Sequence, residues 1–156
     1  MKKVIVNLFF ISLLAMVSCG GNSSENSSSS EKSSNAKGSN NDPVYDIGIG
    51  TIEVVTLGEI NEEQAAKGKE LYKINCTACH KFKKRYIGPA MLGVTQRRTP
   101  EWVMNMIMDP ELMLKENDAA KALFAEYLAP MANQNINEND ARAIYEYFRQ
   151  KDLNQK

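Results

Sequence analysis

Hydrophobic positions in the C-terminal half of the chain recur at helical spacing. Ala141, Ile144, Tyr145 and Phe148 fall at i, i+3, i+4 and i+7, which places them on one face of a helix over about residues 138–151. A half-buried strand would need alternating apolar and polar residues, and no such stretch appears after residue 60. The pattern therefore predicts an all-α fold class.

Start signals divide this region into further helices. A Ser, Thr, Asp or Asn followed by Pro, or by an acidic or amide residue three positions later, is typical of a helix N-terminus. Asn61, Thr99, Asp109 and Asn137 have this character. The predicted helices cover about residues 62–75, 100–108, a short stretch from 110, 118–128 and 138–151.

The first 18 residues have the pattern of an export signal. Lys2 and Lys3 precede Val4 to Val17, a mostly apolar stretch of 14 residues. A helix that spans a bilayer needs about 20 residues. We therefore favour a signal peptide over residues 1–18, with a transmembrane helix as the alternative.

Cys19 follows Ser18 at the end of the apolar stretch, an arrangement that resembles a bacterial lipobox with Met16 in place of the usual Leu. Without lipid, Cys19 would be a lone exposed thiol in an oxidising compartment. We expect lipid on Cys19 and an exported protein anchored to a bacterial membrane, facing the periplasm. The alternative is an ordinary signal peptide followed by an incidental cysteine.

Two segments separate this anchor from the predicted helices. Of the 22 residues from Gly20 to Asn41, nine are Ser, five are Asn and three are Gly. Such a segment buries too little apolar surface to fold, so residues 19–43 are predicted to be a flexible linker. Residues 44–58 are rich in β-branched residues and glycine, and we expect an extended arm lying against the domain at 59–152. A mobile, unpacked arm is the alternative.

Cys76-Thr77-Ala78-Cys79-His80 has the C-x-x-C-H spacing of covalent haem attachment. Two thiols three residues apart can each form a thioether with one vinyl group of the same porphyrin, and the adjacent His supplies Nε2 to the iron. A redox-active C-x-x-C would need a βαβ context, a zinc site would need a fourth ligand, and a disulfide would leave His80 unexplained. We therefore predict one haem c, bound through Cys76 and Cys79 and ligated by His80.

The second axial ligand cannot be another imidazole, because the chain has one His. A methionine thioether is the usual partner, and the chain has eight Met. Met131 lies in a Pro-containing loop between two predicted helices, from which it can reach the opposite face of the haem. Met1 and Met16 leave with the signal, and Met91 lies too close to His80. The other four fall on predicted helices: Met104, Met106, Met108 and Met113.

These motifs resemble class I cytochrome c over about residues 60–152. Gly68, Tyr72 and the C-x-x-C-H motif match the family's first helix, where Gly lets the last helix cross closely; the matching positions on that last helix are Ile144 and Tyr147. The resemblance implies about four to five helices wrapped around one covalently attached haem.

Further positions take their expected roles from the resemblance. Pro89 of the Gly88-Pro89 pair matches the family's proline whose carbonyl accepts the His Nδ1–H, a bond that fixes the ring. Arg97, Arg98 and Trp102 resemble residues that hydrogen-bond haem propionates. The alternative for these three is a solvated Arg pair and a core Trp.

The resemblance also implies a function. We expect a periplasmic single-electron carrier that takes electrons from a quinol-oxidising complex to a terminal reductase or oxidase, nitrous oxide reductase among the candidates, with no small-molecule substrate at the iron. The alternative is a haem enzyme or gas sensor with a displaceable sixth ligand. Such an enzyme would use distal acid–base groups, and no second His is present.

Charge placement suggests how such a carrier would dock. The chain is neutral overall, with 19 basic and 19 acidic residues, which argues against a nucleic-acid binder. Seven basic and no acidic residues lie between Leu71 and Pro100, whereas residues 101–156 have six basic and ten acidic ones. This asymmetry favours redox partners with an acidic docking patch. The alternative is a solvated basic turn at residues 81–85.

Overall fold

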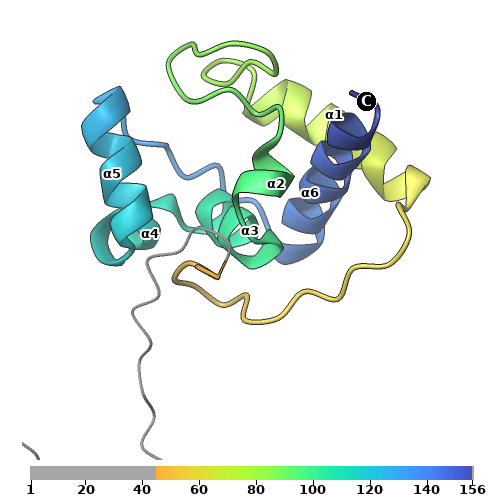
Figure 1. The fold of residues 1–156 in the computed structure, drawn as a ribbon, viewed down its shortest axis with the longest axis horizontal. Helices are drawn as coiled ribbons and strands as arrows, with labels where there is room; N and C mark the ends of the chain where they lie inside the picture. The colour runs from red at the N-terminus through yellow and green to blue at the C-terminus, as the bar shows by residue number, and fades with distance from the viewer. Residues whose placement is uncertain (1–44, 156) are drawn as a thin grey trace, which may run out of the picture. The chain divides into compact units, whose positions relative to one another are not determined.

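The structure is a computed structural model that describes residues 45–155. This part of the chain is helical and contains no strand, which confirms the all-α prediction. The helices are α1 (Glu62–Asn75), α2 (Val94–Arg97), α3 (Pro100–Met108), α4 (Pro110–Glu116), α5 (Asp118–Tyr127) and α6 (Glu138–Leu153) (Figure 1). No helix between residues 45 and 155 has both the length and the apolar character needed to cross a bilayer. The predicted signal peptide, linker and Cys19 lie outside the described residues.

The capping residues set the helix boundaries. Asn61 accepts a hydrogen bond from the Gln64 amide at 2.9 Å, and Thr99 accepts one from the Trp102 amide at 3.1 Å. Asp109 accepts a hydrogen bond from the Leu112 amide, and Asn137 accepts one from the Asp140 amide, both at 3.0 Å. Each side chain satisfies a backbone donor that has no partner within its helix. The four helices predicted from these signals therefore begin where expected.

Helix α2 was not predicted. The side chain that accepts hydrogen bonds from the amides at its N-terminus belongs to another helix. The N-cap position of α2 is Gly93, which has no side chain and a φ of 75°. Instead, the buried Asp152 of α6 accepts hydrogen bonds from the Gly93 amide at 2.6 Å and from the Thr95 amide at 3.1 Å. The hydroxyl of Thr95 also donates to Asp152, at 2.6 Å. This contact ties α2 to the C-terminal end of α6.

Helices α1 and α6 form the main packing pair, and they cross in Figure 1. An aromatic cluster of Tyr72, Phe82, Tyr147 and Phe148 lies at this contact. The Tyr72 ring centroid lies 5.0 Å from that of Phe82 and 5.6 Å from that of Phe148, both edge to face. Edge-to-face pairs add to the stabilisation from burial alone. The cluster joins the segment after His80 to both helices.

Residues 45–58 pack against α3 without forming a strand. Ile52 is 5% exposed, and its amide donates to Oδ1 of Asn105 at 3.0 Å. The Asn105 amide nitrogen in turn donates to the carbonyls of Ile47 and Ile52, at 3.1 and 2.9 Å. The Val55 amide donates to Glu101 at 2.7 Å. Asn105 thus replaces the backbone partners that a sheet would have provided for this segment.

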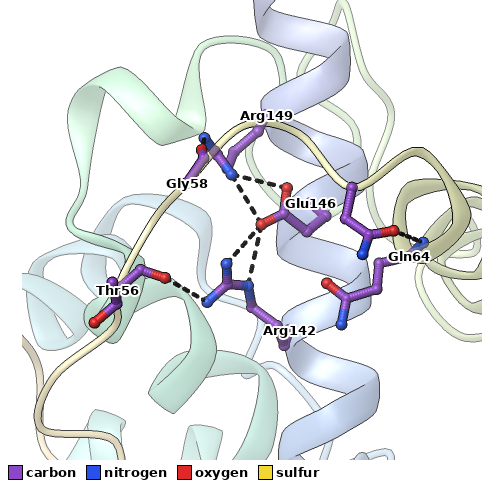
Figure 2. A network of polar contacts seen from close by, with 7 residues as sticks. Thr56, Gly58, Gln64, Arg142, Glu146 and Arg149 are labelled. Carbon is purple, nitrogen blue, oxygen red and sulfur yellow. Dashed lines mark hydrogen bonds and ion pairs between the residues drawn. The ribbon is translucent and has the colours of Figure 1, made fainter.

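A buried carboxylate on α6 also holds this segment (Figure 2). Glu146 is 1% exposed and accepts hydrogen bonds from Arg142 at 2.8 Å and from Arg149 at 2.9 Å. Arg142 also donates to the Thr56 carbonyl at 3.2 Å, and Arg149 donates to the Gly58 carbonyl at 2.7 Å. A charge so far from water needs such pairing. Glu146 therefore links α6 to the segment that precedes α1.

Candidate haem site

The C-terminal end of α1 positions the C-x-x-C-H motif. The Cys76 amide continues the helical pattern by donating to the Tyr72 carbonyl at 2.9 Å. The amides of Cys79 and His80 both donate to the Cys76 carbonyl, at 3.1 and 2.8 Å, and so form a tight turn. Neither Cys76 nor Cys79 is in a disulfide. Both thiols are therefore available for thioether bonds to one porphyrin.

The His80 ring is oriented by the loop that follows it. Its Nδ1 lies 3.0 Å from the Pro89 carbonyl oxygen, as the family resemblance implied. A carbonyl can only accept, so Nδ1 carries the proton and Nε2 keeps its lone pair. Burial lowers the pKa of His80, against the opposing effect of the Pro89 carbonyl, and this favours the neutral ring that binds metal.

Gly88 lets the loop lie close to the His80 ring. A Cβ on Gly88 would lie 2.5 Å from His80 Cε1 and 2.9 Å from Nδ1, closer than real Cβ contacts come. The Gly88 amide donates to the Cys79 carbonyl at 2.9 Å. On the other side, the Tyr72 hydroxyl donates to the His80 carbonyl at 3.0 Å. The backbone of Pro89 and Gly88 therefore holds the His80 ring, and the Tyr72 side chain holds the His80 backbone.

These residues fit a haem c: two thiols at the correct spacing and one neutral imidazole with Nε2 free to bind iron. The family model described as cytochrome c matches residues 65–152 of the chain. The chain belongs to the cytochrome c family. Membership implies covalent haem c, attached through Cys76 and Cys79, and a role in electron transfer.

Solved structures similar to this cytochrome c support the assignment. A cytochrome c from Rhodothermus marinus is 41% identical with a TM-score of 0.67, and the match covers 68% of this chain and 92% of that one. An engineered cytochrome c from the same organism, Rma TDE, is 39% identical with a TM-score of 0.65, over 67% and 91% of the two chains. A cytochrome c domain from Pseudomonas putida, 24% identical over 55% and 88% with a TM-score of 0.50, shares the fold. No curated protein matches the chain.

Met131 lies in the segment between α5 and α6, and its side chain is partly exposed. Other methionines are engaged in the protein interior. Met113 is fully buried, and its sulfur accepts a hydrogen bond from the Ile49 amide at 3.0 Å. Met104 and Met91 are 2% and 9% exposed within the hydrophobic core. The role of Met131 as an iron ligand stays a prediction.

The three residues expected to bind propionates have protein partners in the structure. Arg97 donates to the carbonyls of Leu92 and Ala90, at 2.6 and 3.0 Å. The Arg98 guanidinium lies 4.6 Å from the centre of the Trp102 ring. The single indole N–H of Trp102 donates to Asn117 at 3.1 Å. The propionate roles of Arg97, Arg98 and Trp102 stay predictions.

The Asn117 contact was missed at the sequence level. Asn117 also caps α5, because its Oδ1 accepts from the Ala120 amide at 2.9 Å, and its Nδ2 donates to Asp46 at 2.9 Å. The backbone carbonyl of Asp46 in turn accepts a hydrogen bond from the Thr99 hydroxyl, at 2.7 Å. An Asn directly before a predicted helix indicates a cap, but no sequence signal indicates its bonds to Trp102 and Asp46.

Proposed function

We propose that this cytochrome c is a single-electron carrier in which His80 and Met131 are the axial ligands of the haem iron. The observation that carries the proposal is the 3.0 Å contact between His80 Nδ1 and the Pro89 carbonyl. It leaves Nε2 of the only histidine unprotonated, and it would increase the donor strength of that nitrogen toward iron. A neutral nitrogen on one side and a thioether on the other favour a high potential.

The residues around His80 suit an electron carrier better than a haem enzyme. Haem c would supply the Fe(III)/Fe(II) couple, while Pro89 and Gly88 hold the His80 ring and Tyr72 holds the His80 backbone. Acid–base catalysis at a haem needs a titratable side chain near an open iron position. Met131 fills the sixth position in our proposal, and the chain has no second His to act as the acid–base group.

The docking surface we propose is the basic loop, Lys81–Arg85, which directly follows the haem-binding His80. Lys83 and Lys84 are exposed. Basic side chains beside the attachment site would steer an acidic partner toward the haem and raise the association rate at low salt. The partners would be a quinol-oxidising complex as donor and a terminal reductase or oxidase, such as a nitrous oxide reductase, as acceptor.

Export and lipidation at Cys19 complete the proposal. A lipid on Cys19 would hold the protein at a bacterial membrane on the periplasmic side, which is where C-x-x-C-H motifs receive haem. The linker at residues 19–43 would have a root-mean-square reach of roughly 25–30 Å. That distance would allow the haem domain to move between a donor and an acceptor in the same membrane.

Adding cyanide or hydrogen peroxide to the oxidised protein separates the carrier from the alternative enzyme or sensor. We expect a low-spin ferric spectrum at rest, and cyanide binding that is slow because Met131 must first leave the iron. Peroxide should produce no rapid spectral change. A high-spin resting spectrum with immediate binding of cyanide or peroxide would favour a haem enzyme or sensor and contradict the proposal.

A further inference from the structure

Arg85 joins the loop after His80 to the C-terminal end of α5. Its Nη1 donates to Oε1 of Glu126 at 3.0 Å, and its Nη2 donates to the backbone carbonyl of Glu126 at 2.9 Å. Its guanidinium carbon lies 4.0 Å from the centre of the Tyr127 ring. In Figure 1 the loop between α1 and α2 comes close to this end of α5. One side chain therefore makes an ion pair, a backbone contact and a cation–π contact.

The backbone contact satisfies a group that the helix leaves unpaired. Glu126 lies in the last turn of α5, where carbonyls have no amide partner within the helix. A positive charge there also interacts favourably with the helix dipole. Arg85 is thus a C-terminal cap for α5 that comes from a distant part of the chain.

The segment that follows α5 has few other attachments. Leu128 ends the helix with a φ of 54°, and Asn135 has a φ of 55°, which are unusual conformations for residues other than glycine. Within the described part of the chain, hydrogen bonds of residues 129–136 are local: Gln134 donates to the Ala132 carbonyl, and the Asn135 amide donates to Asn133. At the α6 end, Ile136 packs against the hydrophobic core. The position of residues 129–135 therefore depends on α5 at one end and on Ile136 and the Asn137 cap of α6 at the other.

We propose that Arg85 is a positioning residue for the Met131 segment. By fixing the end of α5 to the loop that contains His80 and Pro89, it sets where residues 128–136 start and keeps the Met131 sulfur in place. This inference rests on the proposed His80 and Met131 ligation. It gives Arg85 a different role from its exposed neighbours Lys83 and Lys84, which we assign to docking.

Two variants test the positioning role without removing a positive charge. Arg85→Lys keeps the charge but loses the planar fork that reaches two oxygens at once. Glu126→Gln removes the ion pair and leaves the basic loop intact. Glu53→Gln is the matched control, because Glu53 is also an exposed carboxylate and makes no ion pair in the described part of the chain.

Two measurements on the haem-loaded protein should respond. Hydrogen–deuterium exchange of amides in residues 128–136 should become several-fold faster in Arg85→Lys and Glu126→Gln, while exchange in α1 and α6 stays unchanged. The affinity of the oxidised protein for imidazole, which must displace Met131, should rise about fivefold, the size expected from losing an exposed charged contact. Glu53→Gln should match the wild type in both measurements.

The outcomes separate this inference from the proposed function. Wild-type exchange in residues 128–136 of both variants would overturn the positioning role, and so would equally faster exchange throughout α1 and α6, since that indicates a general loss of stability. Faster exchange in residues 128–136 with unchanged imidazole affinity would support the positioning role and contradict ligation by Met131.

Discussion

The backbone carbonyl oxygen of Ala143 on α6 lies 1.9 Å from the point that a Cβ on Gly68 of α1 would occupy. The two helices therefore meet backbone to backbone, and no side chain larger than hydrogen fits at residue 68. This close approach brings Tyr72 into contact with Tyr147 and Phe148. Because α1 ends at Asn75, directly before Cys76, the same contact fixes the direction from which the haem-binding motif leaves the core.

The Gly68→Ala variant should lose about 2 kcal/mol or more of unfolding free energy, because α1 and α6 must move apart to admit the methyl group. Urea denaturation of the haem-loaded protein, followed by circular dichroism, measures the change. Gly58→Ala is the matched control, since a Cβ there meets no atom within 4 Å. Equal stability of the two variants would contradict the close contact between α1 and α6.

Met131→Leu keeps the side-chain volume but removes the sulfur that we propose as an iron ligand. The oxidised protein should lose the weak sulfur-to-iron charge-transfer band at the red end of the spectrum. Its potential should fall by an appreciable part of the roughly 0.8 V range that axial ligands span. Absorption spectra and a redox titration measure both effects.

Met91→Leu is the matched control for Met131, because Met91 is buried in the core and lies only eleven residues after His80. It should retain the band and the potential. If Met91→Leu lost the band and Met131→Leu kept it, the ligand assignment would be wrong.

Glu146→Ala should destabilise the protein by about 3–5 kcal/mol, because two arginines lose the buried carboxylate that pairs with them. Residues 51–58 should also become more sensitive to limited proteolysis, since Arg142 and Arg149 connect Glu146 to Thr56 and Gly58 (Figure 2). Glu70→Ala, on the exposed face of α1, should change stability by no more than about 0.5 kcal/mol. Unchanged proteolysis in Glu146→Ala would show that the network does not hold this segment.

Reversing two charges in the basic loop, with Lys83→Glu and Lys84→Glu together, should slow electron transfer to an acidic acceptor protein by about tenfold or more at low salt. The difference from the wild type should shrink as salt screens the charges. Stopped-flow kinetics at several ionic strengths measure this dependence.

Lys115→Glu with Lys121→Glu is the control, because it changes the net charge equally on α4 and α5. If this control slowed the reaction as much as the basic-loop variant, the effect would come from net charge and not from a local docking surface. Wild-type rates that do not depend on salt would also contradict the proposal.

The features that the sequence predicted correctly are those whose signal is local. Asn61, Thr99, Asp109 and Asn137 cap helices from within a few residues, and the spacing from Cys76 to His80 contains the attachment chemistry. The Pro89 carbonyl was found through a resemblance, and the structure places it 3.0 Å from His80 Nδ1.

The features that the sequence did not predict depend on residues far apart in the chain. Helix α2 receives its side-chain contacts from Asp152, 59 residues after Gly93, so no local cap revealed it. The Trp102 indole donates to Asn117, and the contact between Arg85 and Glu126 spans 41 residues. Such contacts follow from the packing of α3, α5 and α6, which hydrophobic periodicity alone does not define.

The intact mass of the denatured full-length protein tests the central claim most directly. After boiling in SDS, wild-type protein should keep its red colour and its haem staining on a gel. Mass spectrometry should show the polypeptide plus one haem, and the Cys76→Ser, Cys79→Ser double variant should show the polypeptide alone. A wild-type polypeptide that releases its haem on denaturation would contradict covalent attachment and, with it, the account of the site.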